Sequence, residues 1–297
     1  MASGFLHRPI AHIAVVAPSS PFDAAGFERG VARLRGRYEV SYEPDILTKK
    51  GFLAGDDARR LGELRAALAS PRVDVVMAAR GGYGATRIAQ LVAADEVRRH
   101  APLLVGFSDV SALHAVWAHA GVSSLHGSMV AALGSVSEPQ FARFCAALEG
   151  RFPERFEGLA TIVPGVAEGV LLGGNLAVLC ALLGTPVFPP LTDAVLFLED
   201  IGERPYRVDR MLTSMRNAGV LQGVRGIVLG AFEQGEPGAD GVTLQDVLRE
   251  RTRDLGVPVV SGFPAGHVDD NQELPFGWRV TIDARTDTST LHIHSAE

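Results

Sequence analysis

The chain has 297 residues, of which 47% are hydrophobic and 21% are charged, a composition typical of a folded protein rather than a disordered one. Its formal net charge of -6 and its short, scattered basic runs disfavour nucleic acid as a partner. We find no export signal and no apolar run of the roughly 18 residues that span a bilayer, so we expect an unexported, cytoplasmic protein without membrane contact.

The first half of the sequence alternates predicted strands with predicted helices. The strands are apolar runs and the helices carry apolar residues three or four positions apart. This alternation predicts an α/β domain with a parallel sheet, in which ligands bind at the carboxyl ends of the strands. The expected strands cover 13–17, 38–46, 73–78 and 102–107, and the expected helices cover 22–37, 56–69, 86–93 and 109–120.

The segment 150–169 contains Gly and Pro and shows only weak periodicity, which favours a domain boundary. We therefore divide the chain into domains 1–160 and 161–297. The second half again mixes apolar strands and amphipathic helices. The strands are expected at 194–198 and 226–232, the helices up to 183 and over 206–218 and 244–253, and further β-like pieces towards the C-terminus.

Ser108 stands where a predicted strand ends and a predicted helix begins. A serine at such a turn can be a nucleophile, because the unpaired amides at a helix start can stabilise an oxyanion. Position 110 is Val rather than the Gly of a nucleophile elbow. The alternative is that Ser108 or Asp109 is simply the N-cap of the helix.

The loop Arg80–Gly84 follows another buried strand and contains consecutive glycines. Glycines allow positive φ and close approach of the backbone, which suits an oxyanion hole or an anion site. The spacing does not match a phosphate-binding P-loop. A tight turn between strand and helix is the alternative interpretation.

Two further polar segments follow apolar strands in the second half. Glu199 and Asp200 end one strand, where a carboxylate could orient an imidazole or simply lie at the surface. His267 lies in a Gly/Pro loop and could act as a general base. The neighbouring acidic and amide side chains do not have the spacing of a calcium loop, so we expect no metal site.

Taken together, the motifs resemble the LD-carboxypeptidase (muramoyltetrapeptide carboxypeptidase) family of serine peptidases. The similarity runs in order from Ile13 to Gly277 through VAPSSP, FLAGDDARR, ARGGYG, GFSDVSALH, GGNLAVLCALLGTP, LFLEDIGERPYRVDRML and PAGHVDDNQELPFG.

The resemblance implies a catalytic triad of Ser108, Glu199 and His267. It also implies an oxyanion hole built from backbone amides, for which Asp109 and Gly82 are the positions that fit. A carboxypeptidase must bind a free carboxylate, and our candidate contacts are Asn175 and Arg80. The resemblance further implies a nucleophile-bearing α/β domain, a smaller β-rich α+β domain that carries the Glu and His, and a site in the groove between them.

The family's usual substrate is a murein tetrapeptide, from which a terminal D-alanine is removed during cell-wall recycling. We expect no metal or organic cofactor, and we expect the protein to form a homodimer. One alternative is a microcin-immunity-like peptidase that cleaves acyl-adenylate-type antibiotics, which would need aromatic side chains to stack a purine. Only Trp117 and Trp278 are present as tryptophans, which favours the murein peptide. Another alternative is a non-catalytic module that binds a small anion.

Overall fold

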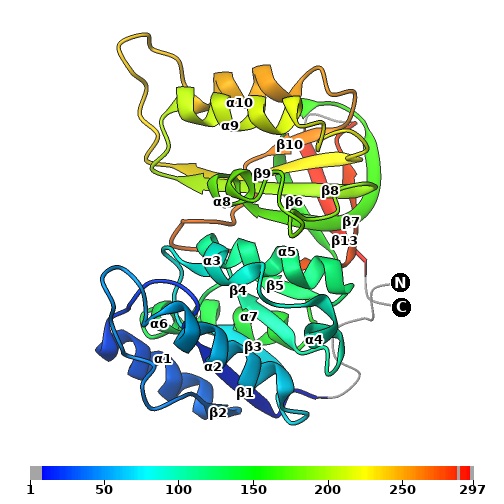
Figure 1. Ribbon diagram of the computed structural model, residues 1–297. Helices are drawn as coiled ribbons and strands as arrows, with labels where there is room; N and C mark the ends of the chain where they lie inside the picture. The colour runs from blue at the N-terminus through cyan, green and yellow to red at the C-terminus, as the bar shows by residue number, and fades with distance from the viewer. Residues whose placement is uncertain (1–8, 286–287, 295–297) are drawn as a thin grey trace. The chain divides into compact units, whose positions relative to one another are not determined.

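The computed structural model describes residues 9–285 and 288–294, which form two compact units (Figure 1). The first unit comprises the chain up to Arg151 and the short segment Glu273–Phe276. The second comprises Phe152–Gln272 and the chain from Gly277 onward. The expected combination of a parallel-sheet α/β domain and a β-rich domain is confirmed. Residues 1–8, where an export signal was sought, lie outside the described residues.

The first unit is built on a six-stranded sheet with the order β11-β5-β4-β3-β1-β2. Neighbouring strands run parallel, except that β11 pairs antiparallel with β5. The central strands are buried along their whole length, as expected for apolar runs covered on both faces. The strands are β1 His12–Val16, β2 Glu39–Ser41, β3 Val75–Ala78, β4 Leu103–Gly106, β5 Ser124–His126 and β11 Leu274–Phe276.

Two groups of helices cover this sheet (Figure 1). In one group α1 packs on α6, and in the other α2, α3, α4 and α5 pack on one another. Right-handed crossovers between parallel strands place such groups on opposite faces. The helices are α1 Ala24–Arg35, α2 Asp57–Ala69, α3 Ala85–Ala89, α4 Ala94–Arg98, α5 Ser111–Ala120, α6 Val130–Leu133 and α7 Glu138–Leu148, with a 3-10 turn η1 at Ser108–Val110.

The second unit is a closed barrel with the order β10-β6-β13-β12-β7-β8-β9. Strands β7, β8, β9 and β10 run parallel, so their carboxyl ends meet at one end of the barrel. The strands are β6 Arg155–Val163, β7 Val166–Asn175, β8 Ala194–Ile201, β9 Gly226–Glu233, β10 Val259–Ser261, β12 Arg279–Asp283 and β13 Thr288–Ile293. The helices are α8 Leu176–Ala181, α9 Pro205–Asn217 and α10 Leu244–Thr252.

Most of the expected elements are confirmed, but three expectations were wrong in part. The predicted helix over 86–93 is only the short helix α3, which ends at Ala89, and a second short helix, α4, begins after the predicted range at Ala94. The expected strand over 38–46 is reduced to β2. The weakly periodic segment 150–169 is largely strand: β6 begins at Arg155, and the division between units falls after Arg151 rather than at 160. Because most residues of β6 are exposed or half-buried, the segment lacks an apolar pattern.

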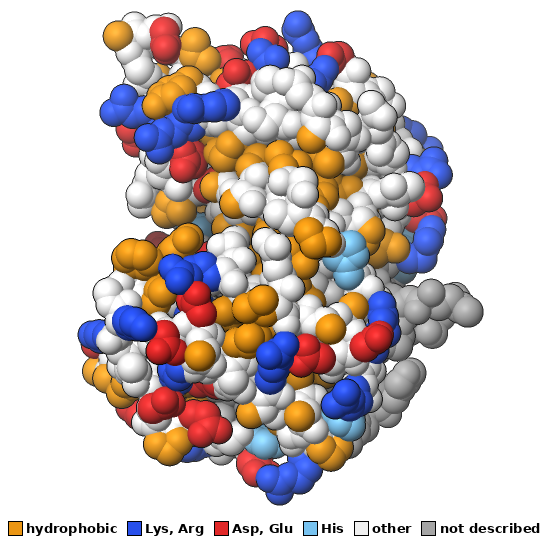
Figure 2. Space-filling view, viewed as in Figure 1, with side chains coloured by type: hydrophobic (Ala, Val, Ile, Leu, Met, Phe, Trp, Pro, Cys, Tyr) orange, Lys and Arg blue, Asp and Glu red, His pale blue; other side chains and the backbone are white. Residues whose placement is uncertain are grey.

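Charged side chains of opposite sign are interspersed on the surface. On the face that Figure 2 shows, Lys and Arg side chains mostly lie close to Asp and Glu side chains. Ion pairs join Arg87 to Asp57 in the first unit and Arg216 to Asp254 in the second. None of the helices among the described residues is long and apolar enough to cross a membrane.

Gly173 shows how closely the barrel strands approach one another. Its φ is +146°, and a Cβ at this position would lie 1.9 Å from the backbone oxygen of Phe197 on the neighbouring strand. Gly184 in the same unit also has a positive φ, +76°, but a Cβ there would meet nothing within 4 Å. Alanine at either position would suffer the backbone strain of a positive φ, but only alanine at Gly173 would also clash with a neighbour. A comparison of the two substitutions therefore measures the clash separately from the strain.

We predict that Gly173→Ala lowers the free energy of unfolding by about 3 kcal/mol, because the new methyl group must displace the β8 backbone. Gly184→Ala should cost only about 1 kcal/mol, the strain of a left-handed alanine. Urea denaturation of the two variants beside the native chain measures both values. Equal losses would contradict the close approach of β7 and β8.

Candidate active site

Ser108 lies in a strained turn directly after β4. Its φ is +62°, in the left-handed region that costs a residue with a side chain about 1 kcal/mol. The preceding Phe107 is extended and α5 starts only at Ser111, so the chain reverses sharply around a half-buried serine. The N-cap position of α5 is Val110, so neither Ser108 nor Asp109 occupies it, and the alternative that one of them is the N-cap of this helix is wrong. Strain of this kind is typical of functional positions.

The glycine loop after β3 lies against Ser108. A Cβ on Gly81 would be 3.1 Å from Cβ and 3.3 Å from Oγ of Ser108, so only glycine allows this approach without displacing its neighbours. The carbonyl of Gly81 accepts a hydrogen bond from the Ser20 amide at 3.2 Å. Because the two ends of a trans peptide point in opposite directions, the N–H of Gly82 is directed away from Ser20. Gly82 itself has a φ of +106°.

Asp109 is buried directly after the serine, and its carboxylate holds two other loops. Oδ2 accepts hydrogen bonds from Ser19 Oγ at 2.6 Å and from the Ala85 amide at 2.7 Å. Burial raises the pKa of this carboxyl, and these two hydrogen bonds act in the opposite direction. The use of its backbone amide in an oxyanion hole stays a prediction.

Glu199 and His267 form a hydrogen-bonded pair in the second unit. Glu199 lies in β8 and is completely buried, and its Oε2 is 2.8 Å from Nδ1 of His267. Gly266 makes this contact possible, because its φ is +121° and a Cβ there would lie 2.7 Å from the same oxygen. Because a carboxylate can only accept a hydrogen bond, Glu199 favours the His267 tautomer that carries its proton on Nδ1 and leaves Nε2 unprotonated.

Asn175 lies beside this pair, at the carboxyl end of β7. Its Oδ1 caps α8 by accepting from the Val178 amide at 3.1 Å, and its Nδ2 donates to Asp200 at 3.1 Å. Burial, and then the nearby Glu199 carboxylate, raise the pKa of Asp200 to about 6. The Asn175 side chain is therefore engaged in holding β7, β8 and α8 together, and its contact with a substrate carboxylate stays a prediction.

Arg80, the other candidate carboxylate ligand, is exposed at the start of the glycine loop. Its Nη1 donates to the Pro21 carbonyl at 2.6 Å.

The structure groups the predicted residues in two sets. Ser108, Asp109, Gly82 and Arg80 belong to the first unit, whereas Glu199, His267 and Asn175 belong to the second.

No group of three or more His, Cys, Asp and Glu side chains in residues 9–285 and 288–294 is placed to hold a metal ion. The acidic loop after His267 has a structural role instead. Asn271 Oδ1 accepts from the amide of Gly266 at 2.9 Å and so shapes the turn that presents the imidazole.

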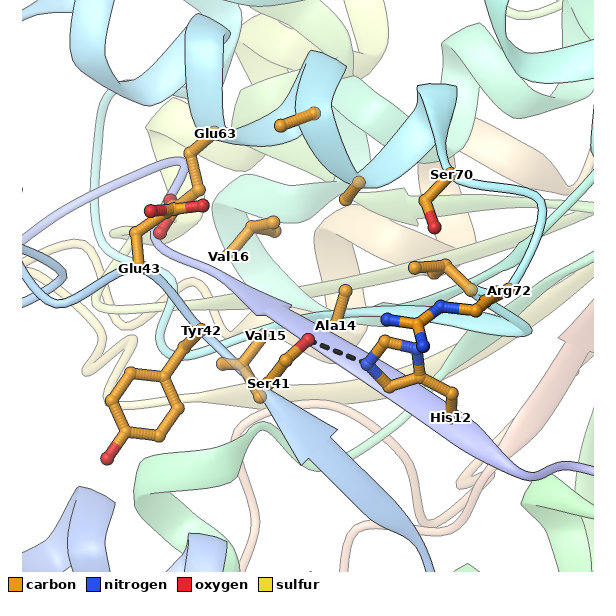
Figure 3. Close-up of a pocket in the computed structure, with 13 residues that line it drawn as sticks. His12, Ala14, Val15, Val16, Ser41, Tyr42, Glu43, Glu63, Ser70 and Arg72 are labelled. Carbon is orange, nitrogen blue, oxygen red and sulfur yellow. Dashed lines mark hydrogen bonds between the residues drawn. The ribbon is translucent and has the colours of Figure 1, made fainter.

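A cavity of about 220 Å³ in the first unit lies apart from the predicted residues. Figure 3 shows it between α2 and strands β1 and β2, with His12 bonded to Ser41 and with Glu63 reaching down from α2. None of the residues predicted for the active site lines it.

Sequence reasoning overlooked several residues that shape the site. Ser19 bonds to Asp109 and Ser20 to Tyr83, and Gly81 rather than Gly82 is the glycine at which an added Cβ would meet the Ser108 side chain. The serines belong to the VAPSSP motif, which ends β1 at the same sheet edge as Ser108. Their position directly after a predicted strand was therefore the signal that could have identified them as residues near the site.

Comparison with known proteins identifies the family of the chain. The LD-carboxypeptidase N-terminal domain model matches residues 13–127, and the LD-carboxypeptidase C-terminal domain model matches residues 168–282. A Streptomyces coelicolor protein named "putative carboxypeptidase" is 40% identical over 95% of this chain and 94% of its own length. The murein tetrapeptide carboxypeptidase of Pseudomonas aeruginosa is 27% identical over 91% of this chain and 92% of its own.

Solved structures give the same assignment. The crystal structure of muramoyltetrapeptide carboxypeptidase from Oxalobacter formigenes matches with a TM-score of 0.83 and 29% identity, over 96% of this chain and 100% of that one. A structure of MccF in complex with glutamyl sulfamoyl guanosine has a TM-score of 0.87 at 19% identity, over 100% of both chains, which shows likeness of fold alone. The fold and the matched domains are those of a peptidase, a hydrolase. The chain belongs to the LD-carboxypeptidase family.

A buried histidine supports the Ser108 turn from within the first unit. His114 on α5 binds the carbonyl of Gly106 through Nε2 at 2.8 Å and Ser124 Oγ through Nδ1 at 2.7 Å. Burial lowers the pKa of His114 to about 4, so the ring is neutral at pH 7. In the unfolded chain its pKa returns to about 6.5, so acid favours unfolding between these two values.

We predict that His114→Gln makes the protein less sensitive to acid. Between pH 7.5 and pH 5 the native chain should lose about 2 kcal/mol of its free energy of unfolding through this histidine, which the variant should not lose. The exposed His119 on the same helix provides the control, since His119→Gln should leave the pH dependence as it is. Urea denaturation at the two pH values measures the difference. A parallel decline in all three proteins would contradict the prediction.

Proposed function

We propose that the protein is a serine L,D-carboxypeptidase that removes the terminal D-alanine from murein tetrapeptides in cell-wall recycling, with Ser108, Glu199 and His267 as its triad. The observation that carries the proposal is the pairing of the buried Glu199 with His267 in a chain whose relatives include a murein tetrapeptide carboxypeptidase. The strained turn at Ser108 supports the choice of nucleophile.

In the proposed mechanism, Nε2 of His267 takes the proton from Ser108 Oγ as the oxygen attacks the carbonyl before D-alanine. Glu199 holds the imidazole tautomer and stabilises the imidazolium that forms. The amides of Gly82 and Asp109 receive the developing oxyanion. The imidazolium then protonates the leaving amine, D-alanine departs, and water activated by the same histidine hydrolyses the acyl-enzyme.

The free carboxylate of the substrate distinguishes a carboxypeptidase from an endopeptidase. In the proposal Arg80 binds this group, since its guanidinium is exposed beside the glycine loop and a guanidinium pairs well with a carboxylate. Asn175 is the second candidate, and it would have to exchange a partner in the second unit to do so.

A second candidate function is cleavage of acyl-adenylate-type antibiotics, as in microcin immunity. Trp117 and Trp278 are both buried and cannot present a ring to a purine. Phe52 and Tyr83, in contrast, are 62% and 47% exposed, with ring centroids 5.5 Å apart. Because Tyr83 follows the Gly81–Gly82 turn, this aromatic pair supplies a stacking surface beside the proposed oxyanion hole.

The test of the murein function is release of D-alanine from a murein tetrapeptide, measured by mass spectrometry. We expect Ser108→Ala to abolish turnover and Glu199→Gln, which disturbs the histidine tautomer, to lower kcat by about 10⁴. A tetrapeptide with an amidated C-terminus should be a poor substrate, and matching thermal unfolding curves control for folding. No release by the native protein would refute the murein function, and equal release by Ser108→Ala would refute the nucleophile.

For the alternative, we predict that Phe52→Ala combined with Tyr83→Ala lowers kcat/KM for an acyl-adenylate substrate by roughly 5- to 150-fold, the worth of a stacked base. Turnover of the murein tetrapeptide should stay within a few-fold of the native value. Steady-state kinetics with both substrates gives the comparison. If the native protein cleaves no acyl-adenylate, or if the double variant cleaves it equally well, the aromatic pair is not a purine platform.

A further inference from the structure

Two buried side chains of opposite charge hold the same two loops of the first unit. The loops are Pro18–Ser20 after β1 and Arg80–Ala85 after β3. Arg60 on α2 is completely buried, and its Nη1 donates to the carbonyls of Pro18 and Gly84, the latter at 2.8 Å. The guanidinium thus bridges one carbonyl from each loop, while Nη2 pairs with Asp57 on its own helix.

Asp109 contacts the residue that follows each of these carbonyls. Its Oδ2 accepts from the hydroxyl of Ser19 and from the amide of Ala85. Arg60 therefore binds the two acceptors and Asp109 binds the two donors at consecutive positions of both loops. This arrangement, which we call the loop clamp, consists of Arg60, Asp109 and the backbone and hydroxyl groups that they bind.

The glycine loop is fitted to this arrangement. A Cβ on Gly84 would lie 2.7 Å from Nη1 of Arg60 and 2.7 Å from a methyl carbon of Leu53, so a side chain there would push the guanidinium out of place. The two loops are also tied directly, since Ser20 donates its amide to Gly81 and accepts from the Tyr83 amide at 3.0 Å through Oγ. The stretch that touches Ser108 is thus held at both of its ends.

Burying a guanidinium and a carboxylate is costly, because both lose their hydration. An apolar pair of similar volume would usually stabilise a protein as well or better, so a buried pair is weak evidence of a contribution to stability. Here the charged hydrogen bonds fix the geometry of two segments that are irregular except for Ala85, the first residue of α3. Such rigidity is what an oxyanion hole requires, since its donors must be in place before charge develops.

We propose that Arg60 and Asp109 are positioning residues that fix the Gly81–Gly82 turn against Ser108 and so preset the oxyanion-binding amide. The inference rests on the proposed function only in its catalytic part. The holding of the loop is a physical property of the first unit and can be measured without turnover.

The first readout is hydrogen exchange of the amides over residues 81–86, followed by mass spectrometry in the native chain and in Arg60→Met and Asp109→Ala. We expect exchange in this loop to be at least about tenfold faster in both variants, because the carbonyl and amide partners are removed. Arg65→Met is the matched control. Arg65 lies on the same helix, is exposed and pairs with Glu96, so its loss should leave the loop unchanged.

The second readout is the division between kcat and KM for the murein tetrapeptide. We expect Asp109→Ala to lower kcat by roughly 10²–10³-fold, the worth of an oxyanion donor, with KM changed less than about threefold. Asp109→Asn keeps an acceptor oxygen but loses the charge, so it should recover most of the activity and remain about tenfold below the native value. Binding of the tetrapeptide to the Ser108→Ala variant should be unaffected by adding Asp109→Ala.

Faster exchange together with a fall confined to kcat would support the proposal. Unchanged exchange over residues 81–86, or faster exchange with full turnover, would overturn it. If Asp109→Ala does not fold, Asp109→Asn and Arg60→Lys test the proposal instead. The same changes in hydrogen exchange and kcat are expected for them, but smaller. If the native protein releases no D-alanine, the proposed function fails, and the exchange result alone decides whether the loop clamp exists.

Discussion

The hydrogen bond between Glu199 and His267 is the interaction on which the proposed mechanism depends. A free histidine exchanges its proton between two ring nitrogens, and only the tautomer with a bare Nε2 can take a proton from a serine through that atom. A completely buried carboxylate at 2.8 Å fixes this tautomer and turns the ring. Burying the Glu199 carboxylate costs free energy. Glu199 lies near the end of β8, where it pairs in register with Asn175, the last residue of β7.

In the first unit, the proposed site depends on backbone geometry instead. Ser108 adopts a left-handed conformation, Gly81 touches its side chain, and Gly84 leaves room for the Arg60 guanidinium. At these positions the backbone adopts a strained conformation or comes so close to a neighbouring group that a side chain would not fit. The buried charges of Arg60 and Asp109 then hold the surrounding loops in one arrangement, which is the property that stabilisation of an oxyanion demands.

The sequence was informative wherever a local pattern corresponds to a local structure. Apolar runs predicted β1, β3, β4 and β8, and the junction after β4 correctly predicted a turn at Ser108. The pairing of Glu199 with His267 came from family resemblance, because no periodicity links residues so far apart in the chain. The same limit hid the contact between Arg60 and the loops that it binds, and the return of Leu274–Phe276 to the first sheet as an antiparallel strand.

The most direct test of the account is to trap the acyl-enzyme. The native protein is mixed with a murein tetrapeptide, quenched with acid after milliseconds, digested and analysed by mass spectrometry for an adduct of the substrate acyl group. The proposed mechanism predicts the adduct on the peptide that contains Ser108 and its loss in Ser108→Ala. An adduct on a different residue, or D-alanine release with no covalent intermediate at any time point, would contradict it.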